Sequence, residues 1–112
     1  MLSDDDFKRN FYRMQSRVHD VAISKGFWEI PRNDGELIML MVTELCEAFE
    51  ALRDGDIQDD KIPDFRGIEA ELADTVIRIM DYAQERCLRL PEAILAKIEM
   101  NKTREHMHGK KF

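Results

Sequence analysis

The chain has 112 residues, of which 44% are hydrophobic and 36% charged, and its formal net charge is −6. Its length has room for one domain, residues 1–112. Its charge disfavours binding to DNA or RNA, and no apolar run approaches the roughly 20 residues of a membrane span, so we expect neither a nucleic-acid nor a membrane partner.

The first predicted helix covers residues 4–25. Ser3 can cap its start, and three acidic residues follow in the first turn, where the helix dipole favours them. Its apolar residues recur at steps of four and three and form one stripe, which comprises Phe7, Phe11, Met14, Val18 and Val21. We expect this helix to end at Gly26. The acidic start does not resemble a signal peptide, which predicts a cytoplasmic protein.

The second predicted helix follows a short loop, residues 27–32, that carries the only Trp of the chain. Asn33 followed by Glu36 is a variant of the capping box. The helix continues to about Asp54, and its apolar residues lie along one face: Leu37, Met41, Leu45, Ala48 and Leu52. Residues 55–65 are polar, contain Pro63, and form the main predicted loop.

The third predicted helix spans about residues 67–90, with apolar residues at helical spacing. Pro91 then stands where a proline is tolerated, in the first turn of a fourth helix that reaches about His106. We expect residues 107–112 to form a flexible tail.

These elements predict an all-α fold, a bundle of four helices. A domain of this size covers its apolar stripes incompletely, so a dimer or a dimer of dimers is expected. Cys46 and Cys87 have no second Cys or His at metal-ligand spacing, and we expect them to be free, buried thiols in a reducing compartment.

Two acidic pairs carry the clearest chemical signal. Glu44 and Glu47 are three residues apart on the second helix, as are Glu71 and Asp74 on the third, so each pair lies on one helix face. Apolar neighbours bring part of this face toward the interior, where unpaired carboxylates repel and lose hydration. An all-oxygen ligand set selects Mg²⁺ or Mn²⁺. Ordinary solvated carboxylates are the alternative. A ferritin-like site is excluded because no His lies three residues after these Glu residues.

The motifs Glu44-x-x-Glu47 and Glu71-x-x-Asp74 resemble the ExxE…ExxD signature of the MazG-like all-α nucleoside triphosphate pyrophosphohydrolases, in their small single-domain branch. The likeness extends over most of the chain from residue 26 onward. It implies hydrolysis of (deoxy)nucleoside triphosphates to the monophosphate and pyrophosphate, with all four acids as Mg²⁺ ligands. Glu47, or else Glu44, would accept the proton of the attacking water.

The resemblance also implies residues that hold the substrate. Lys97, Asn101 and Arg104 fall on one face of the fourth helix and match the phosphate-binding positions of the family; the alternative is that they complement the helix C-terminus. Trp28 either stacks on the base or pins the first helix to the second. Arg78 either contacts phosphate or pairs with an acid such as Asp74 or Asp81.

Two other functions stay open at this point. A related activity, phosphoribosyl-ATP pyrophosphohydrolysis, fits the loop and tail less well. A catalytically silent helical oligomerisation or adaptor module would keep the acidic pairs as a solvated face.

Overall fold

The computed structural model describes residues 3–104 and 111. Its helices are α1 (Asp4–Ser24), α2 (Asp34–Arg53), α3 (Gly67–Glu85) and α4 (Leu90–Lys102). The described residues contain no strand, only an isolated bridge between Gln58 and Arg66. The predicted all-α class with four helices is therefore confirmed. No helix in this part of the chain combines the length and the apolar character that a membrane crossing requires.

The start of α1 is capped as predicted. The side chain of Ser3 accepts the backbone N–H of Asp6, whose carboxylate in turn accepts the N–H of Ser3. At the start of α2, Asn33 accepts the N–H of Glu36 at 2.8 Å. The Glu36 carboxylate pairs with Arg32 instead of closing the capping box, so only half of that motif forms.

The prediction for the end of the third helix was wrong. It ends at Glu85 because Cys87 adopts a left-handed backbone conformation with φ of 55°, and the Leu88 N–H then bonds to the Ala83 carbonyl. No Gly marks this turn in the sequence, which is why the helical pattern suggested a later end. The predicted extension of the fourth helix to His106 lies outside the described residues, as does the predicted tail apart from Lys111.

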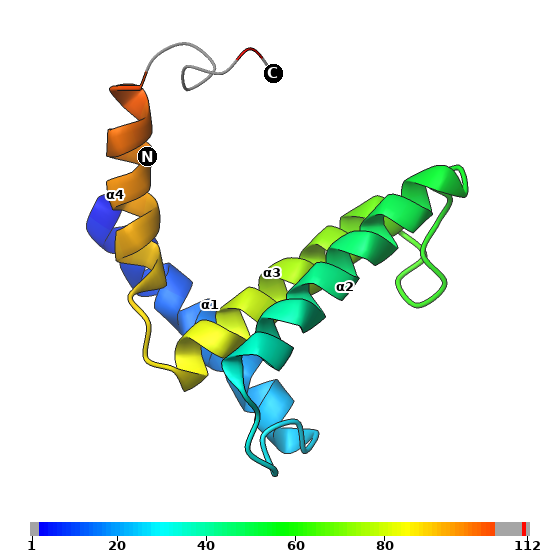
Figure 1. Ribbon diagram of the computed structural model, residues 1–112, viewed down its shortest axis with the longest axis horizontal. Helices are drawn as coiled ribbons and strands as arrows, with labels where there is room; N and C mark the ends of the chain where they lie inside the picture. The colour runs from blue at the N-terminus through cyan, green and yellow to red at the C-terminus, as the bar shows by residue number, and fades with distance from the viewer. Residues whose placement is uncertain (1–2, 105–110, 112) are drawn as a thin grey trace.

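The four helices are arranged as two arms (Figure 1). In one arm α2 and α3 form an antiparallel hairpin, with residues 54–66 connecting them at its far end. The hairpin packs on α1 through α3, and α4 packs along α1, where the Tyr12 hydroxyl donates to Glu92 Oε1 at 2.5 Å. The view also shows that α4 points away from the α2–α3 hairpin.

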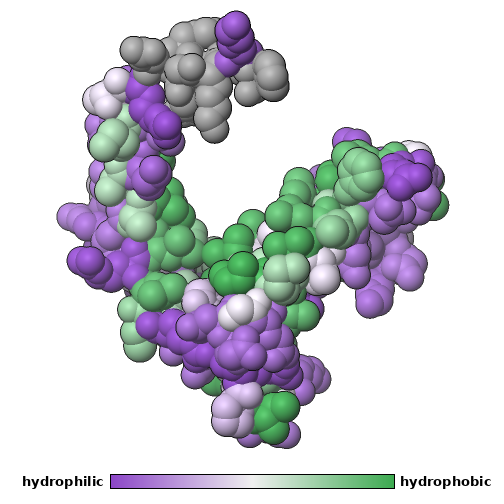
Figure 2. Space-filling model, viewed as in Figure 1, coloured by the Kyte–Doolittle hydropathy of each residue, from purple (hydrophilic) through white to green (hydrophobic). Residues whose placement is uncertain are grey.

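The apolar core of the described residues is small: Leu37, Ala48, Ala70, Met80 and Ala83. Larger apolar side chains stay on the surface. On α2 they form what we call the apolar stripe, with side chains 39–59% exposed at steps of four and three: Ile38, Val42, Leu45, Phe49 and Leu52. Of the apolar face predicted for this helix, Leu37 and Ala48 are thus buried, whereas Leu45 and Leu52 are exposed in the single chain. Apolar surface flanks the hollow between α4 and the hairpin (Figure 2).

The two cysteines are free, as expected, but both are exposed. The prediction that they are buried was wrong. Cys46 lies on the outer side of α2, next to Leu45 of the apolar stripe, and Cys87 lies in the left-handed turn that leaves α3.

The hairpin is closely packed at its loop end, where α3 begins at Gly67. A Cβ atom at this position would lie 3.1 Å from Ala51 Cβ of α2. Ala51 is one helical turn beyond Glu47, and Gly67 is one turn before Glu71. Small residues here let the two helices approach and bring those carboxylates together.

We expect Gly67→Ala to lower the free energy of unfolding by about 1 kcal/mol, because the added methyl group overpacks this contact. Urea denaturation measures the change. Gly35→Ala is the matched control, since a Cβ there meets only Asn33 Oδ1 at an ordinary 3.4 Å. Equal stability of the two variants would contradict the close approach.

Candidate metal centre

The two acidic pairs face each other across the hairpin. Glu44 and Glu47 come from the middle of α2, and Glu71 comes from the first half of α3. One oxygen from each of these three carboxylates lies within 4.8 Å of the others. Glu44 is buried, with 8% of its surface exposed, which confirms that part of the acidic face approaches the interior.

Glu71 is the most perturbed acid of the cluster. Burial raises the pKa of its carboxyl to about 7, helped by a hydrogen bond with Glu47 and by the charges of Glu47, Asp74 and Glu44. Its Oε2 atom is buried without a hydrogen-bond partner in the protein. Burying an acceptor oxygen without a donor costs free energy, and binding of a proton or a cation at this atom would remove that cost.

Asp74, the fourth predicted ligand, lies beside the three-oxygen cluster and is exposed. Burial nevertheless raises the pKa of its carboxyl, and the negative charge of Glu44 raises it further, while the positive charges of Arg78 and Lys61 oppose that rise. Asp74 and the cluster line the same cleft. The structure thus brings together three predicted ligands tightly and places the fourth next to them.

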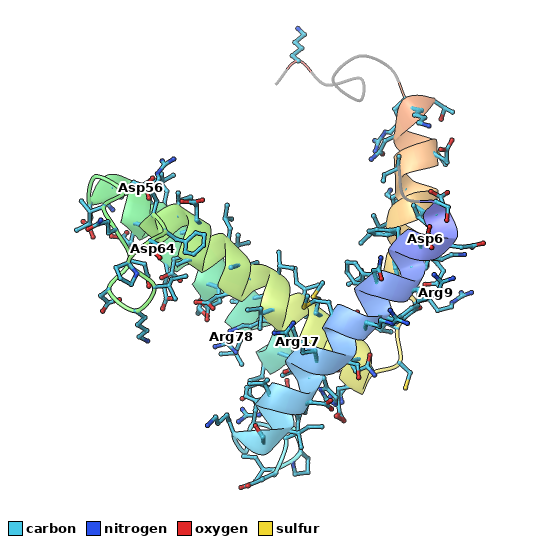
Figure 3. The ribbon with its side chains drawn as sticks, turned by 180° about the vertical axis from the view of Figure 1, so that it is seen from behind. Asp6, Arg9, Arg17, Asp56, Asp64 and Arg78 are labelled. Atoms are coloured by element: carbon cyan, nitrogen blue, oxygen red, sulfur yellow. The ribbon has the colours of Figure 1, made fainter. Side chains whose placement is uncertain are left out.

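Arg78 pairs with an acid, although not with either of those expected. Its Nε donates to Glu44 Oε1 at 2.8 Å and joins α3 to α2. Figure 3 shows Arg78 along the hairpin, between the loop that carries Asp56 and Asp64 and the crossing with α1. This ion pair orients Glu44 and offsets one of the negative charges in the cluster.

The acids open into a cleft of about 830 Å³. Its walls come from the hairpin, from the second half of α1 and from the connecting loop. Besides the acids and Arg78, residues that line it include Val18, Val21, Ala22, Phe27, Asp59, Asp60, Lys61, Ile62 and Asp81. The cleft therefore combines an acidic floor with an apolar wall, and its size suits a small-molecule ligand.

Trp28 is partly buried and is held by contacts with α1 and α3. Its indole N–H donates to Asp81 of α3 at 3.0 Å, and its ring meets His19 of α1 edge to face. His19 Nδ1 also lies 2.6 Å from Asp81 Oδ1, and His19 Nε2 lies 3.3 Å from Glu85. These contacts favour the pinning role for Trp28, here between its loop, α1 and α3. Its neighbour Phe27 lines the cleft.

The predicted phosphate-binding residues Lys97, Asn101 and Arg104 do not reach this cleft within one chain. All three are exposed on or just beyond α4, in the other arm of the molecule. The cation that sequence reasoning missed is Lys61, which lies in the loop and lines the cleft. Its only signal was its position in an acidic loop between the two motifs.

Comparisons of the sequence and structure with protein-family models, curated proteins and solved structures give no match.

The raised pKa of Glu71 predicts a pH-dependent response to Mg²⁺. Its folded-state pKa of about 7 exceeds its ordinary value of 4.5. Without metal, proton binding therefore contributes stability that is complete below pH 4.5 and lost as the pH rises through about 7. A cation competes with this proton, so the Mg²⁺-induced rise in melting temperature should grow between about pH 6 and pH 8.

Thermal melts with and without MgCl₂ across this pH range measure the effect. Glu71→Gln removes the titrating carboxyl and should leave a response that is small and independent of pH. A response of the native protein that is equal at both ends of the range would contradict the prediction.

Proposed function

We propose that the chain is a Mg²⁺-dependent nucleotide pyrophosphohydrolase of the MazG-like type, which cleaves nucleoside triphosphates to the monophosphate and pyrophosphate. The observation that carries the proposal is the three-carboxylate cluster with the buried, unpartnered Oε2 of Glu71. A nucleotide-pool function in the cytoplasm fits this activity.

The donor set fits a hard divalent cation. Glu44, Glu47 and Glu71 offer oxygen atoms at mutual distances within 4.8 Å, and Asp74 lies at the same cleft. Mg²⁺ is commonly bound by a few carboxylates and completes its shell with water and substrate phosphates. When bound, it supplies a Lewis acid for phosphate oxygens and lowers the pKa of water.

The protein side chains divide the remaining tasks. Glu47 is exposed at the cleft and carries no ion pair among the described residues, so it can accept a proton from water. Glu44 is held by Arg78 and is better suited to fixing the cation than to moving a proton. Phe27 and the apolar residues of α1 form the wall against which a base can lie.

Self-association is part of the proposal. The apolar stripe of α2 repeats at steps of four and three, the spacing by which helices pack against one another. Two copies of the same stripe can face each other in a dimer. Because Lys97, Asn101 and Arg104 lie away from the cleft of their own chain, their predicted contact with substrate requires a second copy.

Release of pyrophosphate from a panel of canonical and damaged (deoxy)nucleoside triphosphates, with MgCl₂ and with EDTA, tests the activity. We expect Mg²⁺-dependent release from at least one triphosphate. If every triphosphate stays intact, the proposed function is wrong.

A further inference from the structure

The loop between α2 and α3 is well anchored. The Asp59 N–H donates to the Phe65 carbonyl at 2.9 Å, and the Gly67 N–H donates to the Ile57 carbonyl at 2.8 Å. Asp56 Oδ1 accepts the backbone N–H of Ile68 at 2.8 Å and so ties the loop to the first turn of α3. These bonds fix the loop relative to the acids on the hairpin.

Lys61 occupies a defined position in this loop. The Asp59 carboxylate accepts the backbone N–H groups of Lys61 and Ile62, both at 2.9 Å, and this closes the turn that carries them. All three residues line the acidic cleft. The lysine therefore starts from a fixed backbone at the edge of the site, and its long side chain supplies the reach.

The charges of the cleft single out Lys61. Among the described residues, only Lys61 and Arg78 are cations that line it, against the carboxylates of seven acids: Glu44, Glu47, Asp59, Asp60, Glu71, Asp74 and Asp81. Arg78 is engaged with Glu44, whereas Lys61 forms no ion pair within residues 3–104 and 111.

We propose that Lys61 binds the non-bridging phosphate oxygens of the triphosphate that the acidic cleft holds through Mg²⁺. The inference builds on the proposed function and adds a substrate contact to it. A polyphosphate carries more negative charge than one cation neutralises, and an ammonium group on a flexible stem is suited to a charge-assisted contact with it. Lys61 supplies this contact within the same chain.

The test uses inorganic tripolyphosphate, which needs no knowledge of the base. Isothermal titration with MgCl₂ compares the wild-type chain with Lys61→Ala, Lys61→Arg and Lys25→Ala. Lys25 is an exposed lysine at the end of α1 outside the lining of the cleft. We expect Lys61→Ala to weaken binding about tenfold, Lys61→Arg to weaken it less than about threefold, and Lys25→Ala to leave it unchanged.

Enzyme kinetics and thermal melts distinguish the loss of this phosphate contact from damage to the metal centre. With an accepted triphosphate, Lys61→Ala should raise KM about tenfold with a smaller change in kcat, and its melting temperature should still rise with Mg²⁺. Unchanged tripolyphosphate binding by Lys61→Ala, beside an active wild type, would overturn the role of Lys61 and leave the proposed function standing. A wild type that neither hydrolyses triphosphates nor binds tripolyphosphate would overturn both. Loss of binding in Lys97→Ala but not in Lys61→Ala would assign the contact to α4 and overturn the inference.

Discussion

Glu47→Gln is expected to lower kcat/KM for the accepted triphosphate by about 100-fold or more, since it removes both a metal ligand and the proposed proton acceptor. The amide keeps the size of the side chain but cannot carry its charge. We also expect the rise in melting temperature with Mg²⁺ to disappear. Pyrophosphate release and thermal melts measure the two effects.

The metal-free stability of this variant distinguishes a functional loss from misfolding. The charge of Glu47 and its hydrogen bond with Glu71 both contribute to the raised pKa of Glu71. Their removal should lower the pKa of Glu71, so without Mg²⁺ near neutral pH the variant should melt at the same temperature as the wild type or higher. Lower metal-free stability together with lost activity would instead indicate a structural role.

Glu50→Gln is the matched control for Glu47→Gln. Glu50 lies on the same helix, less than one turn further along, and its carboxylate pairs with Arg53 at 3.3 Å on the surface. It lies outside the lining of the acidic cleft. Activity and metal response should both be retained in this variant. Equal losses in the two variants would mean that net charge, not the position of Glu47, controls the site.

The two acidic pairs could be predicted from the sequence because the spacing within a helix determines which of its side chains share a face. The spacing of Glu44 and Glu47 places both on one face of a helix whatever the tertiary structure, and the same holds for Glu71 and Asp74. The pairing of Arg78 with Glu44 was not predictable in this way. It depends on the register of α3 against α2, which the spacing within one helix does not determine.

The position of α4 shows where sequence reasoning failed. Lys97, Asn101 and Arg104 share a helix face, but a shared face does not determine what that face meets. The left-handed turn at Cys87 ends α3 early, and α4 then packs along α1 instead of over the acids. Lys61 was missed for the opposite reason: it belongs to a polar loop, whose hydrogen bonds to Asp59 give no periodic signal.

If the apolar stripe of α2 forms a dimer interface, a charge introduced into it should dissociate the protein into single chains. Phe49 is 59% exposed and Ile38 is 44% exposed in the single chain. In a dimer formed through this stripe, Phe49→Glu and Ile38→Glu each place a charge in the apolar interface of both copies. Each variant also removes the burial of one apolar side chain per copy, which contributes about 1.5–3 kcal/mol to the free energy of association. We expect both variants to sediment as single chains of 13.2 kDa and the wild type as a multiple of that mass.

Ile30→Glu is the control for this prediction, because Ile30 is 61% exposed in the loop before α2 and lies outside the stripe. The same substitution at this position should leave the sedimenting mass equal to that of the wild type.

The dissociated variants also test the role of α4. If Lys97, Asn101 and Arg104 contact the substrate across the interface, KM for the triphosphate should rise on dissociation while the Mg²⁺-induced stabilisation persists. A wild type that sediments as a single chain at all concentrations would contradict the dimer. Lys97, Asn101 and Arg104 would then not reach the cleft, and the proposed phosphate contact would come from Lys61 of the same chain.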